Sequence, residues 1–208
     1  MTRIIENAAD VAIGAAWLAG QDVRFARALE TCGPLPLRRR KDGFREILNA
    51  ITSQQLSVAS ANAIWARMET AGMCEADAIL DASDDDLRAC GFSRQKITYA
   101  RDLAAADLDY TAFRTMPAEQ VIAELVAIRG IGAWTAEIYV MFSLGHADVF
   151  APGDLALQEA ARVLFDLDAR PKEKALREMA EAWSPWRAVA ARLLWAYYRI
   201  IKEREGIR

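Results

Sequence analysis

Apolar side chains recur at helical spacing along most of this chain. From Phe44 to Ile51, and again from Val58 to Met68, hydrophobic residues fall three or four positions apart, and Trp65 belongs to the second stripe. This period marks one buried face of an α-helix, whereas the Val/Ile/Thr alternation typical of strands is nearly absent. Alanine, a strong helix former, is abundant. The pattern therefore predicts an all-α protein.

Capping residues and breakers set the expected limits of the helices. Asp42, Ser57, Ser83 and Ser93 are residue types that cap helix N-termini, and Pro117 suits a first helical turn. We therefore expect helices over residues 10–19, 22–30, 42–52, 57–70, 155–165, 171–182 and 185–203. Further helices are expected to run from Ser83 to near Cys90, to begin at Ser93 and extend through Leu103, and to begin at Pro117 and lead into a helix–turn–helix within residues 125–139.

The composition narrows the class of protein. A chain of 208 residues with 53% hydrophobic side chains can bury a core as one domain or two small lobes. It has no N-terminal signal pattern and no apolar run near the ~18 residues that a membrane span needs. We expect a soluble cytoplasmic protein, associated with the nucleoid if the source is bacterial. Three scattered cysteines argue against a disulfide framework, and the single histidine, His146, excludes a His-rich zinc site.

The net charge of −3 argues against a protein that coats nucleic acid. Any binding to DNA would need a focused positive face or backbone amides, which carry no formal charge. The densest basic run is Arg38–Lys41. We interpret it as a solvated loop, with phosphate contact as the alternative.

One stretch carries most of the functional information. Leu125 to Tyr139 reads as a helix, a Gly-Ile-Gly turn and a second helix, and a Pro-Gly loop ending at Asp154 follows. Gly130 and Gly132 can adopt positive φ and leave no side chain in the way. Backbone N–H groups at the start of the second helix are then free to meet a phosphate. The turn predicts a clamp on the DNA backbone.

Four segments together resemble the helix–hairpin–helix (HhH-GPD) DNA glycosylases, and more narrowly their 3-methyladenine DNA glycosylase II branch. They are residues 51–58 (Ile-Thr-Ser-Gln-Gln-Leu-Ser-Val), 128–136 (Ile-Arg-Gly-Ile-Gly-Ala-Trp-Thr-Ala), 148–154, and Trp183-Ser-Pro-Trp-Arg187 with Trp195. The likeness extends over roughly residues 40–200. It implies one all-α glycosylase domain over residues 1–208 with two helical lobes, residues 1–40 plus 145–208 and residues 41–144 with the hairpin at 125–140. The base-binding cleft would lie between the lobes.

The resemblance assigns the catalytic role to Asp154, with Asp148 as a competitor. Cleavage of an N-glycosidic bond builds positive charge on the sugar, and a nearby carboxylate stabilises that charge. An N-alkylated purine is already cationic, so its departure needs no strong general acid. The alternative interpretation of Asp154 is an N-cap for the helix that starts at Leu155.

The resemblance also suggests an aromatic base pocket built from Trp134, Trp195 and Tyr139. Bifunctional relatives carry a lysine at the place of Trp134 that forms a Schiff base and nicks the strand. Tryptophan there implies a monofunctional enzyme without lyase activity. An indole face favours a cationic base by roughly 0.5–2 kcal/mol. The alternative interpretation of Trp134 and Trp195 is core packing. Tyr198 is a further pocket candidate, and Trp65, Trp183 and Trp186 are interpreted as core.

Flipping a nucleotide leaves a gap in the base stack that some side chain must fill. The resemblance places this wedge at Gln54 and Gln55, and we favour Gln55, with Ser57 capping the next helix. The alternative is that the two glutamines brace the helices on either side.

The hairpin amides of Gly130, Gly132 and Ala133, together with Thr135, are expected to hold phosphates beside the lesion. In the resembled family, carbonyls of the turn often bind a monovalent cation, and here these would belong to Val126, Ile128 and Ile131. Such Na⁺ or K⁺ would be structural; no other cofactor is expected. Three cysteines cannot supply the four-cysteine iron–sulfur cluster of some relatives.

The expected activity is hydrolysis of alkylated purines, 3-methyladenine and 7-methylguanine, from double-stranded DNA during base excision repair. The expected partner is duplex DNA with a damaged base, bound by a monomer, and neither a membrane nor the β-rich N-terminal domain of some relatives is expected. Two alternatives stay open. One is a glycosylase for deaminated, etheno or oxidised bases, and the other is a noncatalytic hairpin module that only binds DNA.

Overall fold

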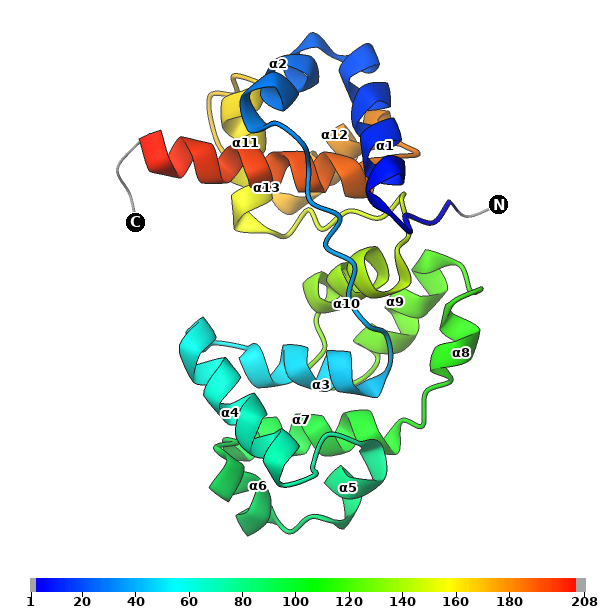
Figure 1. The fold of residues 1–208 in the computed structure, drawn as a ribbon, viewed down its shortest axis with the longest axis vertical. Coiled ribbons are helices and arrows are strands. Elements are labelled where there is room, and N and C mark those ends of the chain that lie inside the picture. The colour runs from blue at the N-terminus through cyan, green and yellow to red at the C-terminus, as the bar shows by residue number, and fades with distance from the viewer. Residues whose placement is uncertain (1–2, 205–208) are drawn as a thin grey trace. The chain divides into compact units, whose positions relative to one another are not determined.

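The computed structural model describes residues 3–204. The chain divides into two compact units, residues 1–39 with 140–208 (unit 1) and residues 40–139 (unit 2). Helices dominate both units (Figure 1), and the expectation of an all-α fold is confirmed. The β-structure found within residues 3–204 is an isolated antiparallel bridge between Ile4 and His146. Across the same residues, no helix is both long and apolar enough to cross a membrane.

Unit 1 is built around its last helix. Its elements are α1 (Ala8–Gln21), α2 (Val23–Cys32), the π-helical turn η1 (Val140–Leu144), α11 (Leu155–Leu164), α12 (Glu173–Met179), the 3₁₀ turn η2 (Ala180–Trp183) and α13 (Arg187–Arg204). Helix α13 packs against α1, α2 and α11, and every residue from Ala188 to Leu194 is buried. A helix that is covered on all sides needs small residues at close contacts. Gly14 of α1 is one such residue, because a Cβ there would lie 2.6 Å from the Trp186 ring.

Unit 2 carries the hairpin. Its helices are α3 (Phe44–Ser53), α4 (Val58–Thr70), α5 (Ala76–Asp81), α6 (Asp84–Cys90), α7 (Arg94–Ala105), α8 (Tyr110–Phe113), α9 (Ala118–Val126) and α10 (Ala133–Tyr139). Helix α3 packs against α4, α7 and α10, and α9 packs against α10. The face of α3 predicted from its periodicity, which includes Ile47, Leu48 and Ile51, forms the core as expected.

Three of the four predicted side-chain caps are confirmed, and Pro117 is the N-cap of α9 rather than a residue of its first turn. Ser57, Ser83 and Ser93 cap α4, α6 and α7 through their hydroxyl oxygens. Asp42 does not cap α3: the N-cap is Gly43, and the Asp42 carboxylate instead accepts hydrogen bonds from Arg114 at 2.7 and 3.2 Å. A long-range ion pair has taken the side chain that the local pattern assigned to the helix.

Two residues predicted for the buried stripe of α4 lie elsewhere. Val58 is 78% exposed, and Trp65 is only half-buried, with the Arg45 guanidinium 5.8 Å from its ring centroid. The predicted core tryptophans of unit 1, Trp183 and Trp186, are buried as expected. Val58 stands in the first turn of α4, next to the connection from α3, where few side chains pack over it.

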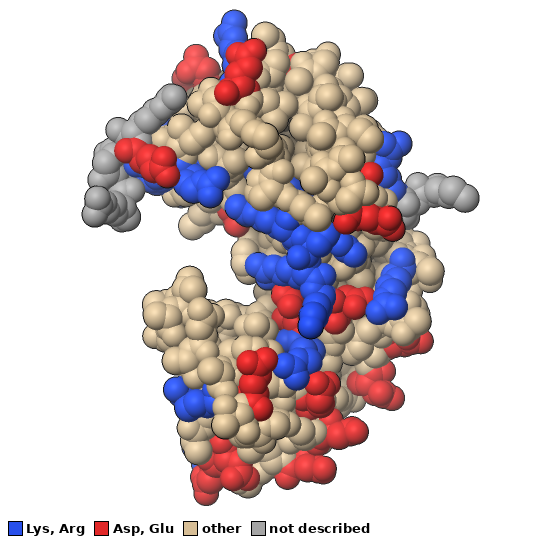
Figure 2. Space-filling model, in the orientation of Figure 1, with Lys and Arg blue, Asp and Glu red and all other residues tan. Residues whose placement is uncertain are grey.

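The acidic residues that give the chain its net charge are unevenly distributed. Figure 2 shows Asp and Glu side chains gathered over the end of unit 2 formed by α5 and α6. This end contains the first-turn carboxylates of those helices, Asp77, Asp84, Asp85 and Asp86. The net charge of −3 therefore says little about the local potential at the hairpin.

Candidate functional site: the hairpin, the wedge loop and Asp154

The hairpin turn joins α9 to α10 and depends on Gly130. The amide of Ile128 donates to the Leu125 carbonyl and that of Ile131 to the Ile128 carbonyl, both at 3.1 Å. Gly130 has φ +95°, and a Cβ there would lie 2.3 Å from the Tyr99 ring. A residue with a side chain would thus meet both a strained backbone and a blocked space.

Gly132 plays a different part from the one predicted. It is not among the residues with positive φ, but a Cβ there would meet nothing within 4 Å. Gly132, Ala133 and Trp134 are all exposed. The start of α10 therefore presents its backbone openly, which is what a phosphate contact requires. Thr135 is buried with 9% exposure, so any contribution from its hydroxyl is restricted.

The loop between α3 and α4 separates the roles of the two glutamines. The Gln54 side-chain amide donates to the Gly130 carbonyl at 2.9 Å, so this residue ties the loop to the hairpin. Gln55 has φ +58°, in the left-handed region that non-glycine residues rarely adopt. Such strain concentrates at functional positions. The bracing interpretation thus suits Gln54, and Gln55 stays the predicted wedge.

Two apolar neighbours of Gln55 were missed by the sequence reasoning. Leu56 is 40% exposed and Val58 78% exposed. Exposed aliphatic side chains beside the strained Gln55 give this loop an apolar tip. Their position next to the glutamines was visible in the sequence, but their exposure was not, because Val58 also fits a helical stripe.

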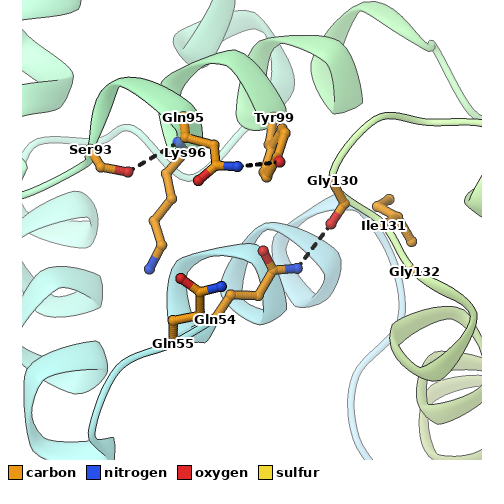
Figure 3. Close-up of a pocket in the computed structure, with 9 residues that line it drawn as sticks. All are labelled: Gln54, Gln55, Ser93, Gln95, Lys96, Tyr99, Gly130, Ile131 and Gly132. Carbon is orange, nitrogen blue, oxygen red and sulfur yellow. Dashed lines mark hydrogen bonds between the residues drawn. The ribbon is translucent and has the colours of Figure 1, made fainter. Parts of the chain in front are cut away.

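The loop of residues 54–57 between α3 and α4, which contains the predicted wedge, is called the wedge loop. A hollow of about 390 Å³ opens between this loop, α7 and the hairpin turn. Its lining consists of Gln54, Gln55, Ser93, Gln95, Lys96, Tyr99, Gly130, Ile131 and Gly132, and Figure 3 shows these three segments converging on it. The Lys96 ammonium donates to the Thr52 carbonyl near the end of α3, and burial lowers the pKa of Lys96. Gln95 donates from its side-chain amide to the Tyr99 hydroxyl at 2.6 Å.

Trp134 and Tyr139, the predicted pocket residues of unit 2, differ in their exposure to solvent. Trp134 is 47% exposed, so its indole is not the core residue of the alternative interpretation. Tyr139 is only 4% exposed, and its hydroxyl accepts a hydrogen bond from the Gly43 amide at 3.0 Å. Burial raises the pKa of Tyr139 to about 12. A ring enclosed in this way supports the start of α3, and its role as a pocket wall stays a prediction.

Asp154 in unit 1 is held by the helix that follows it. Its Oδ1 accepts hydrogen bonds from the Ala156 and Leu157 amides at 2.9 and 3.0 Å, which makes it the N-cap of α11. The capping interpretation and the catalytic one are therefore compatible, since the cap fixes the direction of the carboxylate. The residue is half-buried.

Gln158 secures the same loop and was not predicted. It is 7% exposed, and its side-chain amide donates to the Pro152 carbonyl at 2.8 Å. The Asp154 amide donates to the Ala151 carbonyl at 3.0 Å, which closes the Pro-Gly turn. Gln158 lies one helical turn after Asp154, so spacing was an available signal, but the bond to the loop carbonyl depends on the turn geometry.

Asp148, the competing carboxylate, accepts hydrogen bonds from other side chains of the protein. Its two oxygens accept from Arg187 at 2.6 and 3.0 Å and from the Ser184 hydroxyl at 2.8 Å. Burial acts to raise the pKa of Asp148, but the bonds from Arg187 and Ser184 outweigh burial and the pKa is lowered. A carboxylate with these partners anchors the start of α13.

Trp195 is half-buried in unit 1 among aromatic and cationic groups. Its ring centroid lies 5.7 Å from that of Phe142 and 5.9 Å from the Arg38 guanidinium. Beyond Phe142, the fully buried Arg192 donates to the Leu37 and Ala188 carbonyls at 2.8–3.2 Å. Burial, with Arg38 and Arg39 nearby, lowers the pKa of Arg192 to about 10.

The basic run Arg38–Lys41 has internal partners. Arg39 donates to the Phe142 and Ser143 carbonyls at 3.4 and 2.8 Å, and Arg40 pairs with Glu46 at 3.3 Å. These bonds fix the chain between α2 and α3, which supports a structural role for that part of the run.

The predicted residues thus fall into two sets. Unit 1 contains Asp154 and Trp195, and unit 2 contains the wedge loop, the hairpin and Trp134. Within unit 2, the Gln54–Gly130 hydrogen bond joins the wedge loop to the hairpin.

Comparison with known proteins places this arrangement in a family. Residues 48–185 match the model of the HhH-GPD superfamily base excision DNA repair proteins. The chain is 29% identical over 203 residues to DNA-3-methyladenine glycosylase 1 of Schizosaccharomyces pombe, covering 92% of this chain and 89% of the relative.

Two solved structures are similar in sequence and in fold. The DNA-3-methyladenine glycosidase of Bacillus halodurans has 35% identity and a TM-score of 0.81, over 89% of this chain and 88% of that one. The Schizosaccharomyces pombe 3-methyladenine DNA glycosylase Mag1, in complex with abasic DNA, has 30% identity and a TM-score of 0.74, over 88% of this chain and 94% of that one. The hairpin, the loop ending at Asp154 and these matches together show that this chain belongs to the HhH-GPD superfamily of base excision DNA repair proteins.

Proposed function

We propose that this protein is a monofunctional DNA glycosylase that hydrolyses the N-glycosidic bond of alkylated purines such as 3-methyladenine and 7-methylguanine. The observation that carries the proposal is the Asp154 carboxylate, held by two amides of α11 at the end of the Pro-Gly loop. The chain covers 89% of a relative named DNA-3-methyladenine glycosylase 1 and 88% of a solved structure named DNA-3-methyladenine glycosidase.

The chemistry follows from the charge that develops on the sugar as the base leaves. A fixed carboxylate stabilises that charge and can orient the attacking water. An alkylated purine is a good leaving group because it is already cationic. The bonds to the Ala156 and Leu157 amides hold the carboxylate in place, so little reorganisation is needed when the charge appears.

Binding of DNA is assigned to unit 2. The exposed start of α10, at Gly132 and Ala133, meets a backbone phosphate, and Gln55 enters the stack as the base is flipped. Leu56 and Val58 add apolar contact beside it. The S. pombe relative Mag1 was solved in complex with abasic DNA, the product of such a reaction. We expect this protein to act as a monomer in the cytoplasm, at the nucleoid if the source is bacterial.

The absence of lyase activity is inferred from Trp134. Strand cleavage by the family's bifunctional members depends on a lysine amine at this position. An indole cannot form a Schiff base. Its indole is 47% exposed, and an exposed aromatic ring suits contact with a cationic base.

We also propose a monovalent cation on the carbonyls of Val126, Ile128 and Ile131. Val126 is the last residue of α9, where helix carbonyls lack intrahelical donors. The Ile128 carbonyl accepts from the Ile131 amide at 3.1 Å and keeps a second lone pair. Carbonyl oxygens of this kind suit Na⁺ or K⁺, which would add positive charge close to the phosphates. Replacement of K⁺ by a bulky quaternary ammonium ion at equal ionic strength should then weaken binding to DNA.

The test is base release from duplex DNA treated with a methylating agent. The freed base is identified by chromatography, and the strands are analysed with and without alkali. We expect free 3-methyladenine and 7-methylguanine, with strands that break only after alkali. Breakage without alkali would refute the monofunctional assignment. A folded protein that releases neither base, but releases hypoxanthine or ethenoadenine from defined duplexes, would have a different substrate class.

A further inference from the structure

We propose that arginine side chains beside Trp195 promote departure of the base by repelling the positive charge that an alkylated purine carries while it is attached to the sugar. Arg38 is an exposed member of this group and faces the bound base. The inference rests on the proposed function, because it concerns what drives the same reaction. All of its residues belong to unit 1.

Guanidinium groups lie against two aromatic rings of unit 1. The chain that follows α2 passes across α13 (Figure 1), and Arg192 of α13 donates to its Leu37 carbonyl at 3.0 and 3.2 Å. The Arg38 guanidinium carbon lies 5.9 Å from the Trp195 ring centroid. That of Arg192 lies 4.8 Å from the Phe142 centroid, and the two rings are 5.7 Å apart. The surroundings of Trp195 are therefore positively charged.

This arrangement is unfavourable for the folded protein. Arg38 has φ +52°, in the left-handed region that residues with a side chain rarely adopt. Arg192 is fully buried, and its burial together with the charges of Arg38 and Arg39 lowers its pKa. Backbone strain and crowded like charges are retained where a function needs them.

The contacts of Arg192 show that it acts through its charge. It donates through all three guanidinium nitrogens, to the Leu37 and Ala188 carbonyls. A fully buried group with these partners does not reach a DNA phosphate. An aromatic ring beside a guanidinium plane is instead a surface on which nucleobases stack. The ligand that fits Trp195 and Arg38 is therefore a base.

The positive surroundings act differently on the base before and after cleavage. An N-alkylated purine is cationic in the nucleotide. When the bond from its ring nitrogen to C1′ breaks, both electrons stay with the base, which becomes neutral, and positive charge appears on the sugar, where the Asp154 carboxylate stabilises it. Water then bonds to C1′ and its proton passes to the carboxylate or to solvent. Repulsion from Arg38 is thus present in the bound substrate and is relieved as the base leaves, which speeds the reaction.

The mechanism predicts opposite effects on affinity and on rate when Arg38 loses its charge. Binding of the cationic base should become tighter, and its release should become slower. A residue that only supports the fold would not improve binding. A residue that contacts a phosphate would weaken binding to every duplex.

The experiment uses Arg38→Met, which removes the charge at similar length, and Arg38→Lys, which restores it. Arg27→Met is the matched control, because Arg27 is an exposed arginine of α2 in the same unit. Affinity is measured by fluorescence anisotropy in the Asp154→Asn background, with duplexes that carry 7-methylguanine or guanine at one position. The rate is the single-turnover release of 7-methylguanine by the same variants with Asp154 intact.

We expect Arg38→Met to increase the preference for the 7-methylguanine duplex over the guanine duplex by about threefold to tenfold. This is the range for unit charges about 6 Å apart that solvent partly screens. The rate of release should fall by a similar factor. Arg38→Lys and Arg27→Met should match the parent protein in both measurements.

The proposal requires both changes, and either one alone would overturn it. Weaker binding of Arg38→Met to both duplexes, with a salt dependence reduced by about one ion, would also overturn it and would indicate a phosphate contact. Failure of the wild type to release any damaged base would refute the glycosylase assignment. An active wild type whose affinity and rate are unchanged by Arg38→Met would refute only the role of the arginines.

Discussion

The two roles of the Asp154 carboxylate can be separated by a pair of substitutions. Its Oδ1 caps α11 through the Ala156 and Leu157 amides at 2.9 and 3.0 Å. Asparagine caps a helix about as well as aspartate, whereas alanine does not. Both Asp154→Asn and Asp154→Ala remove the negative charge, but only Asp154→Ala also removes the cap.

The expected magnitudes follow from this geometry. Loss of an N-cap costs about 1 kcal/mol of the free energy of unfolding. In a chain of 208 residues this corresponds to a fall in Tm of about 2–4 °C. Asp154→Ala should show that fall, and Asp154→Asn should unfold within about 1 °C of the wild type. Both should lower the rate of base release by about 10²–10³-fold or more, as expected when a preorganised electrostatic group is lost.

The assay combines thermal unfolding followed by circular dichroism with single-turnover release of 7-methylguanine from methylated duplex DNA. Asp22→Ala provides the matched control, because Asp22 caps α2 in the same unit through the Arg24 amide at 2.8 Å. It should lose comparable stability and keep the wild-type rate. Release by Asp154→Asn at the wild-type rate would refute the catalytic role. An equal fall in Tm for both Asp154 variants would refute the capping argument.

Three further predictions concern the supports of the site. Gln158→Leu should lower the single-turnover rate of base release about tenfold with unchanged affinity for DNA, because the loop before α11 loses a buried hydrogen-bond donor. The control is Leu164→Ala at the far end of α11, which should lower the stability of the protein without lowering this rate. Gly130→Ala should cost about 2–3 kcal/mol of the free energy of unfolding and weaken DNA binding, since φ is +95° and the added Cβ would lie 2.3 Å from an aromatic ring; wild-type Tm and affinity would contradict this. Asp148→Asn should lower the free energy of unfolding by about 1 kcal/mol at pH 7. This value is small because the ion pair with Arg187 is partly exposed to solvent. Because the folded pKa of Asp148 lies below its ordinary value of 3.8, this contribution is present above pH 3.8 and lost as the pH falls through the folded pKa, so urea titrations of the two proteins should converge in acid.

Local signals in the sequence were sufficient for the longer helices and for the motif, whereas the short helices α5 and α8 were not predicted. Hydrophobic spacing located the buried face of α3, and the hydroxyls of Ser57, Ser83 and Ser93 cap helices as predicted. The need for glycine at position 130 was also predictable from the turn. These features depend on residues within a few positions of one another, so the period and the capping chemistry can be read directly from the chain.

The hydrogen-bond partners that lie far apart in the chain could not be predicted from the sequence. Asp42 and Asp148 are chemically ordinary carboxylates, and only the fold supplies Arg114 to the first and Arg187 to the second. In the same way, only the fold buries Tyr139 and brings the Gly43 amide to its hydroxyl. No local pattern distinguishes a tyrosine that faces a pocket from one that supports a helix.

The sequence by itself determined the helical class, the hairpin and the presence of an aspartate at the end of the Pro-Gly loop. Tertiary structure decided which of the two glutamines is tied to the hairpin, because the Gln54–Gly130 bond joins segments that are far apart in the chain. It also decided that Gln95, Tyr99 and Lys96 share a hollow with the wedge loop. Periodicity specifies which face of each helix is buried, whereas the packing of α7 against α3 specifies which side chains meet.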